Sequence, residues 1–222
     1  MIGFVSVGEL VERIPDGASL LIGGFMGVGT PTQLIDGLVE AKKRNLTVIA
    51  NDTAKPNLGI GRLIRAKLVK KAIVSHIGLN PETQRQMVDG DLDVQLVPQG
   101  TLVECIRAGG MGLGGVITRT GVGTNLERAD NTIVIRETKY LLELPIRADF
   151  ALIAANRADQ FGNLEYSLTA ENFNPVMALA ADTVIAEAQR IVSVGVIPPD
   201  SVKTPGPLVD YLISNNRDSY VA

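Results

Sequence analysis

Short apolar runs alternate with amphipathic segments along the first half of the chain. Runs rich in leucine, isoleucine, valine and alanine predict buried strands. These runs occupy residues 19–22, 46–50, 72–76 and 93–97. After each run, apolar residues spaced three or four apart predict a helix. The predicted helices begin at Thr30, Gly61, Asn80 and Thr101. Because strand and helix alternate, we expect an open, mainly parallel α/β sheet flanked by helices.

The second half of the chain interrupts this pattern with a glycine-rich segment. Residues 109–123 contain seven glycines and predict a long loop, which in a compact domain is more often functional or contact-forming than merely structural. Residues 132–136 and 139–143 predict a small antiparallel hairpin. Further strands are predicted at 150–154, 163–167 and 183–187, and further helices at 174–180 and 208–213. No linker separates these parts, so we expect a single domain over residues 1–222.

Three predicted helices start with a capping box, in which a serine or threonine is followed three residues later by glutamate or glutamine. The pairs are Ser6 with Glu9, Thr30 with Gln33, and Thr101 with Glu104. The first box leads into a helix expected from Glu9 to Ile14, the second opens the helix from Thr30, and the third opens a helix that runs to Arg107.

A glycine-rich loop joins the first strand to the helix that begins at Thr30. Glycine lets the backbone approach a ligand closely, and free amides at a helix start attract anions or partial negative charge. The candidate ligand-binding segment is Gly23, Gly24, Phe25, Met26, Gly27, Val28 and Gly29. Taken alone, the loop is explained equally well as a turn needed only for packing.

Composition and charge narrow the classes of protein. The chain has 222 residues, with 21 lysine and arginine against 24 aspartate and glutamate residues, so its net charge is −3. Without a basic stripe or tryptophan, nothing favours nucleic-acid binding. Cys105 is the only cysteine, which excludes a disulfide within the chain. With no long apolar run, we expect a cytoplasmic protein that binds no membrane.

Several common catalytic and cofactor motifs are missing. His76 is the only histidine and there is no G-x-S-x-G elbow, which argues against a serine hydrolase. Asp89 and Asp91 are more simply explained by a solvated turn than by a metal site, so no metal is expected. The G-x-x-x-x-G-K-[ST] phosphate loop is absent. A dinucleotide site is only weakly supported, with Asp52 as ribose ligand, 23 residues after Gly29.

Polar residues follow three predicted strands at their carboxyl ends, where open α/β sheets bind ligands. They are Asn51, His76 and Gln99. The amides of Gln99 and Asn51 could donate to a developing oxyanion, or could equally cap a loop or close a turn. His76 is more simply a structural residue, and Cys105 a buried, inert thiol. Donors for an oxygen-rich ligand are therefore present without a nucleophile. The chain either binds without chemistry or takes its nucleophile from another chain.

Several separated motifs resemble those of the family I coenzyme A transferases. The first is D-G-x-x-L-L-I-G-G-F-x-x-x-G-x-P at 16–31. The others are I-A-N-D-T at 49–53, V-P-Q-G-T-L at 97–102, R-A-G-G at 107–110 and N-F-N-P at 172–175. The resemblance covers essentially the whole chain. It is greatest to the alpha (A) subunit of the acetate or butyrate:acetoacetate CoA-transferase type.

The resemblance implies a transferase that moves CoA between a short-chain acyl-CoA and a carboxylate such as acetoacetate, acetate or butyrate. In the family, a glutamate on the beta subunit carries CoA as a glutamyl-CoA thioester, by double displacement. The S-E-N-G type motif that holds this glutamate is missing here. The resemblance therefore implies a hetero-oligomer with a beta subunit, two or more of each chain. It implies no permanently bound cofactor, since the CoA thioester is a substrate.

Residue by residue, the resemblance gives roles to two amides. Gln99 matches the family glutamine that helps bind the thioester or anhydride oxygen, and Asn51 matches an active-site asparagine. The loop at 23–29 matches the segment described as CoA-binding. Asp52 and Glu171 stand where relatives often have asparagine and arginine, so neither is given a role. In particular, Glu171 is not assigned as the nucleophile.

A different class of function is a non-catalytic effector-binding domain for an acyl-CoA or a sugar phosphate. A sugar-phosphate isomerase, which shares this general fold, is a further alternative, but it needs its own acid and base, and the sequence offers no compelling pair. A neighbouring reading frame that encodes S-E-N-G would favour the transferase. One that encodes a DNA-binding module would favour the effector domain.

Overall fold

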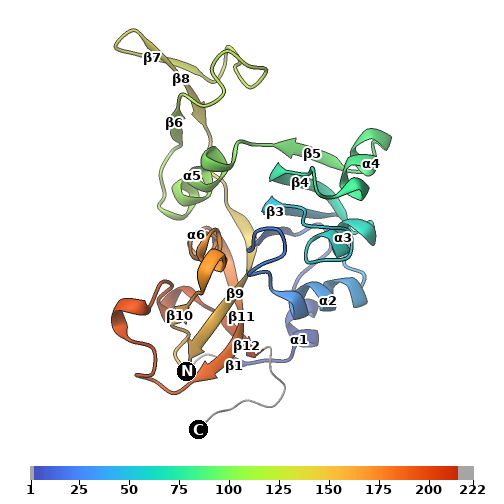
Figure 1. Cartoon of the computed structure of the whole chain (residues 1–222), viewed down its shortest axis with the longest axis vertical. Helices are drawn as coiled ribbons and strands as arrows, with labels where there is room; N and C mark the ends of the chain where they lie inside the picture. Colours follow the sequence, from blue (N-terminus) through green and yellow to red (C-terminus); the bar gives the residue numbers. More distant parts are fainter. Residues whose placement is uncertain (1–2, 215–222) are drawn as a thin grey trace.

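The computed structural model describes residues 3–214, drawn in Figure 1. Eight strands follow the order β1-β12-β11-β9-β2-β3-β4-β5, each parallel to its neighbours, and the short β10 pairs antiparallel with β9. The strands are β1 (Gly3–Phe4), β2 (Ser19–Ile22), β3 (Leu46–Asp52), β4 (Val69–His76), β5 (Asp93–Leu96), β9 (Ala148–Asp159), β10 (Leu164–Glu165), β11 (Ala181–Val192) and β12 (Tyr211–Ser214). The predicted open, mainly parallel sheet is confirmed.

Helices cover the sheet from two sides (Figure 1). They are α1 (Val7–Glu12), α2 (Thr32–Glu40), α3 (Gly61–Arg65), α4 (Pro81–Asp89), α5 (Gln99–Gly110) and α6 (Asn174–Met177), with 3-10 turns η1 (Leu168–Glu171), η2 (Pro199–Ser201) and η3 (Gly206–Leu208). Leu20 and Ile22 pack with buried residues of α1, α2 and α3, whereas Leu21 packs with those of α5 and α6. Side chains alternate between the two faces of a strand, and both faces of β2 are covered, which explains why Leu20, Leu21 and Ile22 are all apolar. Among the helices of residues 3–214, none has the length and apolar character needed to cross a membrane.

A small antiparallel sheet stands out from the body as an arm (Figure 1, top). The predicted hairpin forms from β7 (Thr132–Ile135) and β8 (Thr138–Glu143), and β6 (Val116–Thr118) adds a third strand beside β8. The loop prediction for 109–123 is therefore wrong in part. α5 continues to Gly110, and the β-branched run Val116–Thr118 finds a pairing partner that the glycines around it had obscured.

Only one of the three predicted capping boxes forms. Glu9 N donates to Ser6 Oγ at 3.3 Å, and Ser6 N donates to Glu9 Oε2 at 3.0 Å. The boxes at Thr30 and Thr101 are wrong. α2 begins at Thr32 and α5 at Gln99, each directly after a proline and neither with a side-chain cap from that position.

The predicted helix at 208–213 is also wrong. Tyr211–Ser214 forms β12, which pairs with β11 on one side and with β1 on the other. A short apolar run has no period that distinguishes a strand from a helix, and here tertiary pairing decides. The helix predicted at 174–180 is limited to Asn174–Met177.

The order of strands in the sheet reverses at β2. One half continues from β2 through β3 to β4 and β5, and the other continues through β9 to β11 and β12. Open α/β sheets bind ligands beyond the carboxyl ends of their strands at such a switch point. The glycine-rich loop leaves the carboxyl end of β2 at this point.

Candidate functional site

The loop that follows β2 folds back as a tight turn. Phe25 and Val28 exchange two backbone hydrogen bonds, each of 2.9 Å. The two residues between them have positive φ, 51° at Met26 and 86° at Gly27, as expected for a two-residue hairpin turn with glycine at its second position. Met26 is 42% exposed and Val28 53% exposed. The loop therefore has a defined hairpin-turn conformation that exposes apolar side chains to solvent.

Asp52, at the end of β3, anchors the tip of this loop. Its Oδ2 accepts a hydrogen bond from Met26 N at 2.8 Å, and its Oδ1 accepts one from Ala54 N at 2.6 Å. The side chain is buried, and both carboxylate oxygens are engaged by backbone amides. These contacts give Asp52 a role in shaping the loop rather than in binding a ribose.

Asn174, the first residue of α6, anchors the other end of the loop. Its Nδ2 donates to the carbonyl of Gly29 at 2.9 Å, and its Oδ1 accepts from Ala154 N, on β9, at 2.9 Å. Gly23 makes room for this amide, because a Cβ at that position would lie 1.7 Å from Asn174 Oδ1. Asn174, the second asparagine of the N-F-N-P motif, therefore ties the loop to β9 across the switch point.

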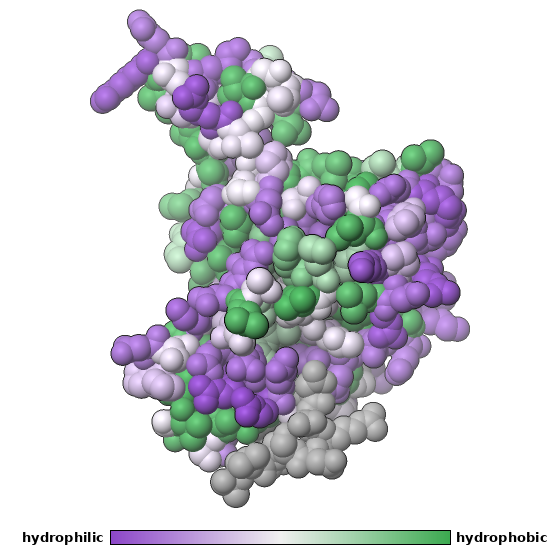
Figure 2. Space-filling view, viewed as in Figure 1, coloured by the Kyte–Doolittle hydropathy of each residue, from purple (hydrophilic) through white to green (hydrophobic). Residues whose placement is uncertain are grey.

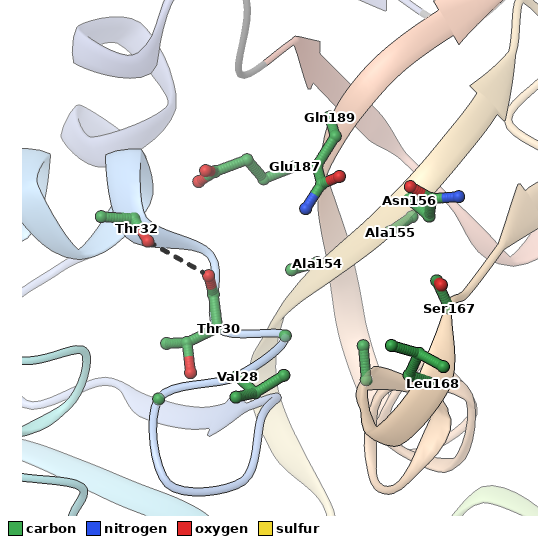
Figure 3. Close-up of a pocket in the computed structure, with 13 residues that line it drawn as sticks. Val28, Thr30, Thr32, Ala154, Ala155, Asn156, Ser167, Leu168, Glu187 and Gln189 are labelled. Atoms are coloured by element: carbon green, nitrogen blue, oxygen red, sulfur yellow. Dashed lines mark hydrogen bonds between the residues drawn. The ribbon is translucent and has the colours of Figure 1, made fainter.

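The start of α2 is already occupied by a carboxylate. Glu187, buried on β11, accepts hydrogen bonds from Gln33 N at 2.9 Å and Leu34 N at 3.2 Å, and its carboxylate also meets the amide of Thr32. Figure 3 shows its side chain extending toward this end of the helix. The expectation that these amides attract a ligand is therefore wrong, because a carboxylate of the chain itself satisfies them.

The buried carboxyl of Glu187 predicts a pH-dependent stability. Burial raises the pKa of Glu187 to about 7 from an ordinary 4.5, although hydrogen bonds from the α2 amides favour its charged form. Between these two values the folded chain holds a proton that the unfolded chain has lost, so the free energy of unfolding falls as pH rises. The fall should approach about 3 kcal/mol. Urea unfolding at pH 4.5 and 7.5 should show this fall in the wild type and not in Glu187→Gln. Parallel pH profiles of the two proteins would contradict it.

One pocket lies between the loop, η1 and the strands β9 and β11 (Figure 3). It measures about 350 Å³, and the side chains of Thr30, Asn156 and Gln189 give it polar walls. Gly27 and Gly29 also line it, and their backbone amides have no acceptor within residues 3–214. This pocket therefore offers several donors to the polar part of a ligand.

A second pocket, of about 380 Å³, borders the first half of the loop and the start of α5. Its lining is Phe25, Met26, Ser75, His76, Leu79 and Gln99. Its walls are largely apolar because Phe25, Met26 and Leu79 form much of the lining, and Leu79 is 38% exposed. Gln99 supplies an exposed amide among them. The structure thus places Gln99 and the loop around one apolar pocket, in which the Gln99 amide is a hydrogen-bond donor.

Gln99 and Asn51 are in direct contact. Gln99 Nε2 donates to Asn51 Oδ1 at 2.9 Å. Ser75 Oγ lies 2.9 Å from the same oxygen and 2.7 Å from the backbone carbonyl of Asn51. Asn51 is completely buried, and its Nδ2 has no partner in the described part of the chain. Ser75 is not among the residues predicted from the sequence, although its place next to His76 at the end of a strand was a usable signal.

The other candidate groups do not supply a nucleophile here. Cys105 is 2% exposed, and burial, reinforced by the charge of Glu143, raises the pKa of its thiol to about 11. Glu171 Oε1 lies 3.3 Å from Lys203 Nζ. His76 is exposed at the second pocket, which has no carboxylate in its lining. A search of residues 3–214 finds no cluster of three His, Cys, Asp or Glu that could hold a metal ion.

Comparison with known proteins agrees with the resemblance seen in the motifs. The model of the coenzyme A transferase family matches residues 4–215. The acetate CoA-transferase subunit alpha of Escherichia coli K12 is 53% identical over 198 residues, which cover 89% of this chain and 90% of that protein. The acetoacetyl-CoA:acetate/butyrate CoA transferase alpha subunit of Clostridium acetobutylicum is 52% identical, with 89% and 91% covered.

A solved structure extends the likeness to three dimensions. The acyl-CoA transferase YdiF of Escherichia coli O157:H7, in a thioester complex with CoA, matches with a TM-score of 0.84 at 26% identity. The match covers 98% of this chain and 48% of that one, so this chain spans about half the length of that protein. With the family match over nearly every residue and relatives above 50% identity, this chain belongs to the coenzyme A transferase family.

Proposed function

We propose that this chain is the alpha subunit of a heteromeric enzyme that moves CoA between a short-chain acyl-CoA and a carboxylate. Acetoacetate, acetate and butyrate are the expected carboxylates, because two relatives above 50% identity carry these substrates in their names. CoA enters as the thioester substrate, and the enzyme needs no permanently bound cofactor. The lone, buried Cys105 suits a reducing compartment, so we place the reaction in the cytoplasm.

The contact between Gln99 and Asn51 is the observation that carries this proposal. A side-chain amide has two N–H groups. Gln99 uses one for Asn51 and leaves the other for the apolar pocket. An acyl group in this pocket would direct its thioester oxygen at that donor. Asn51 holds the amide in place, and the loop from Gly23 to Gly29 forms a wall where CoA approaches, with the amides of Gly27 and Gly29 as donors.

The nucleophile then comes from a beta subunit. Its glutamate carboxylate attacks the thioester carbon, the C–S bond breaks, and CoA leaves as a thiolate, which gives an acyl-glutamyl anhydride. The thiolate attacks the glutamyl carbonyl and releases the first carboxylate, so that CoA becomes a glutamyl thioester. An acceptor carboxylate takes CoA by the reverse steps. In each tetrahedral state Gln99 donates to the oxygen that gains negative charge.

The surface around the loop suits contact with this subunit. Met26, Val28, Leu79 and Leu168 are exposed apolar side chains that line the two pockets. Figure 2 shows hydrophobic surface in the middle of the visible face, while the edge on the right is mostly hydrophilic. Interface cores are depleted of charged residues in this way. We propose an assembly with two or more copies of each chain.

A panel of acyl-CoA donors and carboxylate acceptors tests the function. The chain assembled with its beta subunit should convert acetoacetyl-CoA and acetate to acetyl-CoA, measured by chromatography of the CoA esters, with butyrate as an alternative acceptor. Succinate and a sugar phosphate serve as control ligands. Binding of acyl-CoA without turnover by the assembled protein would favour the effector-binding domain instead.

A further inference from the structure

We propose that Ser75 positions the oxyanion donor Gln99 by fixing the amide of Asn51. This inference rests on the proposed role of Gln99. Ser75 matters because it contacts the one side chain to which Gln99 is tied.

Strand pairing brings Ser75 opposite Asn51. Ala50 pairs with Val74 and Asp52 with His76 in neighbouring parallel strands, so Asn51 and Ser75 face one another between these pairs. The Ser75 hydroxyl has a single hydrogen, and both of its nearby acceptors belong to Asn51: the carbonyl at 2.7 Å and Oδ1 at 2.9 Å. When Oδ1 accepts, the hydroxyl fixes the side-chain amide of Asn51 directly.

Asn51 has little else to hold its amide. Within residues 3–214, its Oδ1 forms hydrogen bonds only with Ser75 Oγ and Gln99 Nε2, and its buried Nδ2 has no hydrogen-bond partner. Gln99 itself is exposed, and an exposed glutamine is free to rotate unless a fixed partner holds it. Without Ser75, the two side-chain amides of Asn51 and Gln99 would keep only each other as hydrogen-bond partners. The donor would then spend less time aimed at the substrate oxygen.

A matched pair of variants isolates the hydroxyl. Threonine and valine have nearly the same shape and both suit a strand, so Ser75→Thr and Ser75→Val differ mainly in the hydroxyl. In the assembled enzyme, Ser75→Thr should keep kcat within about threefold of the wild type. Ser75→Val should lower kcat about tenfold with KM nearly unchanged, because partial loss of orientation costs less than the roughly 10²-fold loss from a 1 Å misplacement. Ser75→Ala, which adds no atoms, should match Ser75→Val and guards against overpacking.

A double-mutant cycle shows whether Ser75 acts through Gln99. In a Gln99→Ala background, adding Ser75→Val should lower kcat by less than about twofold. An undiminished tenfold loss would overturn the inference, and so would equal kcat in the threonine and valine variants. A loss that only follows a lower melting temperature or less assembled enzyme would also overturn it.

The same experiments separate this inference from the proposed function. If Gln99→Ala leaves kcat unchanged, the donor role fails and the positioning role falls with it. If Gln99→Ala lowers kcat but Ser75→Val and Ser75→Ala do not, the proposed function stands and only the positioning role is rejected.

Discussion

The purified chain should transfer no CoA by itself and should become fully active when its beta subunit is added. The apolar pocket beside Gln99 has no carboxylate in its lining, and the one thiol, Cys105, is buried with a raised pKa. The pocket therefore has no carboxylate that could form the glutamyl-CoA intermediate. Formation of acetyl-CoA from acetoacetyl-CoA and acetate should stay at the level of the uncatalysed reaction until the partner is present.

The control for this experiment is a partner in which the nucleophilic glutamate is replaced by glutamine. That pair should assemble normally on a sizing column and remain inactive. The active pair should follow ping-pong kinetics, because one product leaves before the second substrate binds. Turnover by the single purified chain would reject both the missing nucleophile and the dependence on a partner.

Gln99→Ala should lower kcat of the assembled enzyme by roughly 10²- to 10³-fold, the usual loss when one oxyanion donor is removed. KM should change little, because the missing hydrogen bond is strongest when the oxygen becomes charged. Gln95 is a matched control: it is an exposed glutamine on the edge strand β5, outside both pockets. Gln95→Ala should keep wild-type kcat. An unchanged kcat in Gln99→Ala, measured at saturating substrate, would reject the donor role.

Local patterns were enough to predict the architecture. Ser19–Ile22 is recognisable as a strand because Leu20, Leu21 and Ile22 form an uninterrupted apolar run, which is typical of a parallel strand covered on both faces. Strand and helix alternation then implies parallel pairing, and polar residues at strand ends identify Asn51. The contact between Asn51 and Gln99 follows from this geometry, since the carboxyl ends of parallel strands share one edge of the sheet.

Long-range contacts explain what the sequence did not predict. The start of α2 is set by Glu187, more than 150 residues away, so the local Thr30–Gln33 pattern had a stronger competitor. Asn174 is likewise distant from the loop that it anchors. The short run that forms β12 became a strand because β11 and β1 offer it backbone partners on both sides. Local propensity carries no information about such partners.

The place of β9 beside β2 also governs the order of events during synthesis. Leu20 pairs with Val48 on one side and with Phe150 on the other. Until Phe150 has left the ribosome, β2 is an unprotected edge with apolar residues on both faces, the kind of surface that invites aggregation. Contacts this far apart along the chain also form slowly. The first β-α-β unit therefore cannot form the surroundings of the glycine loop alone. The candidate site around this loop stays incomplete until the second half of the chain has been synthesised.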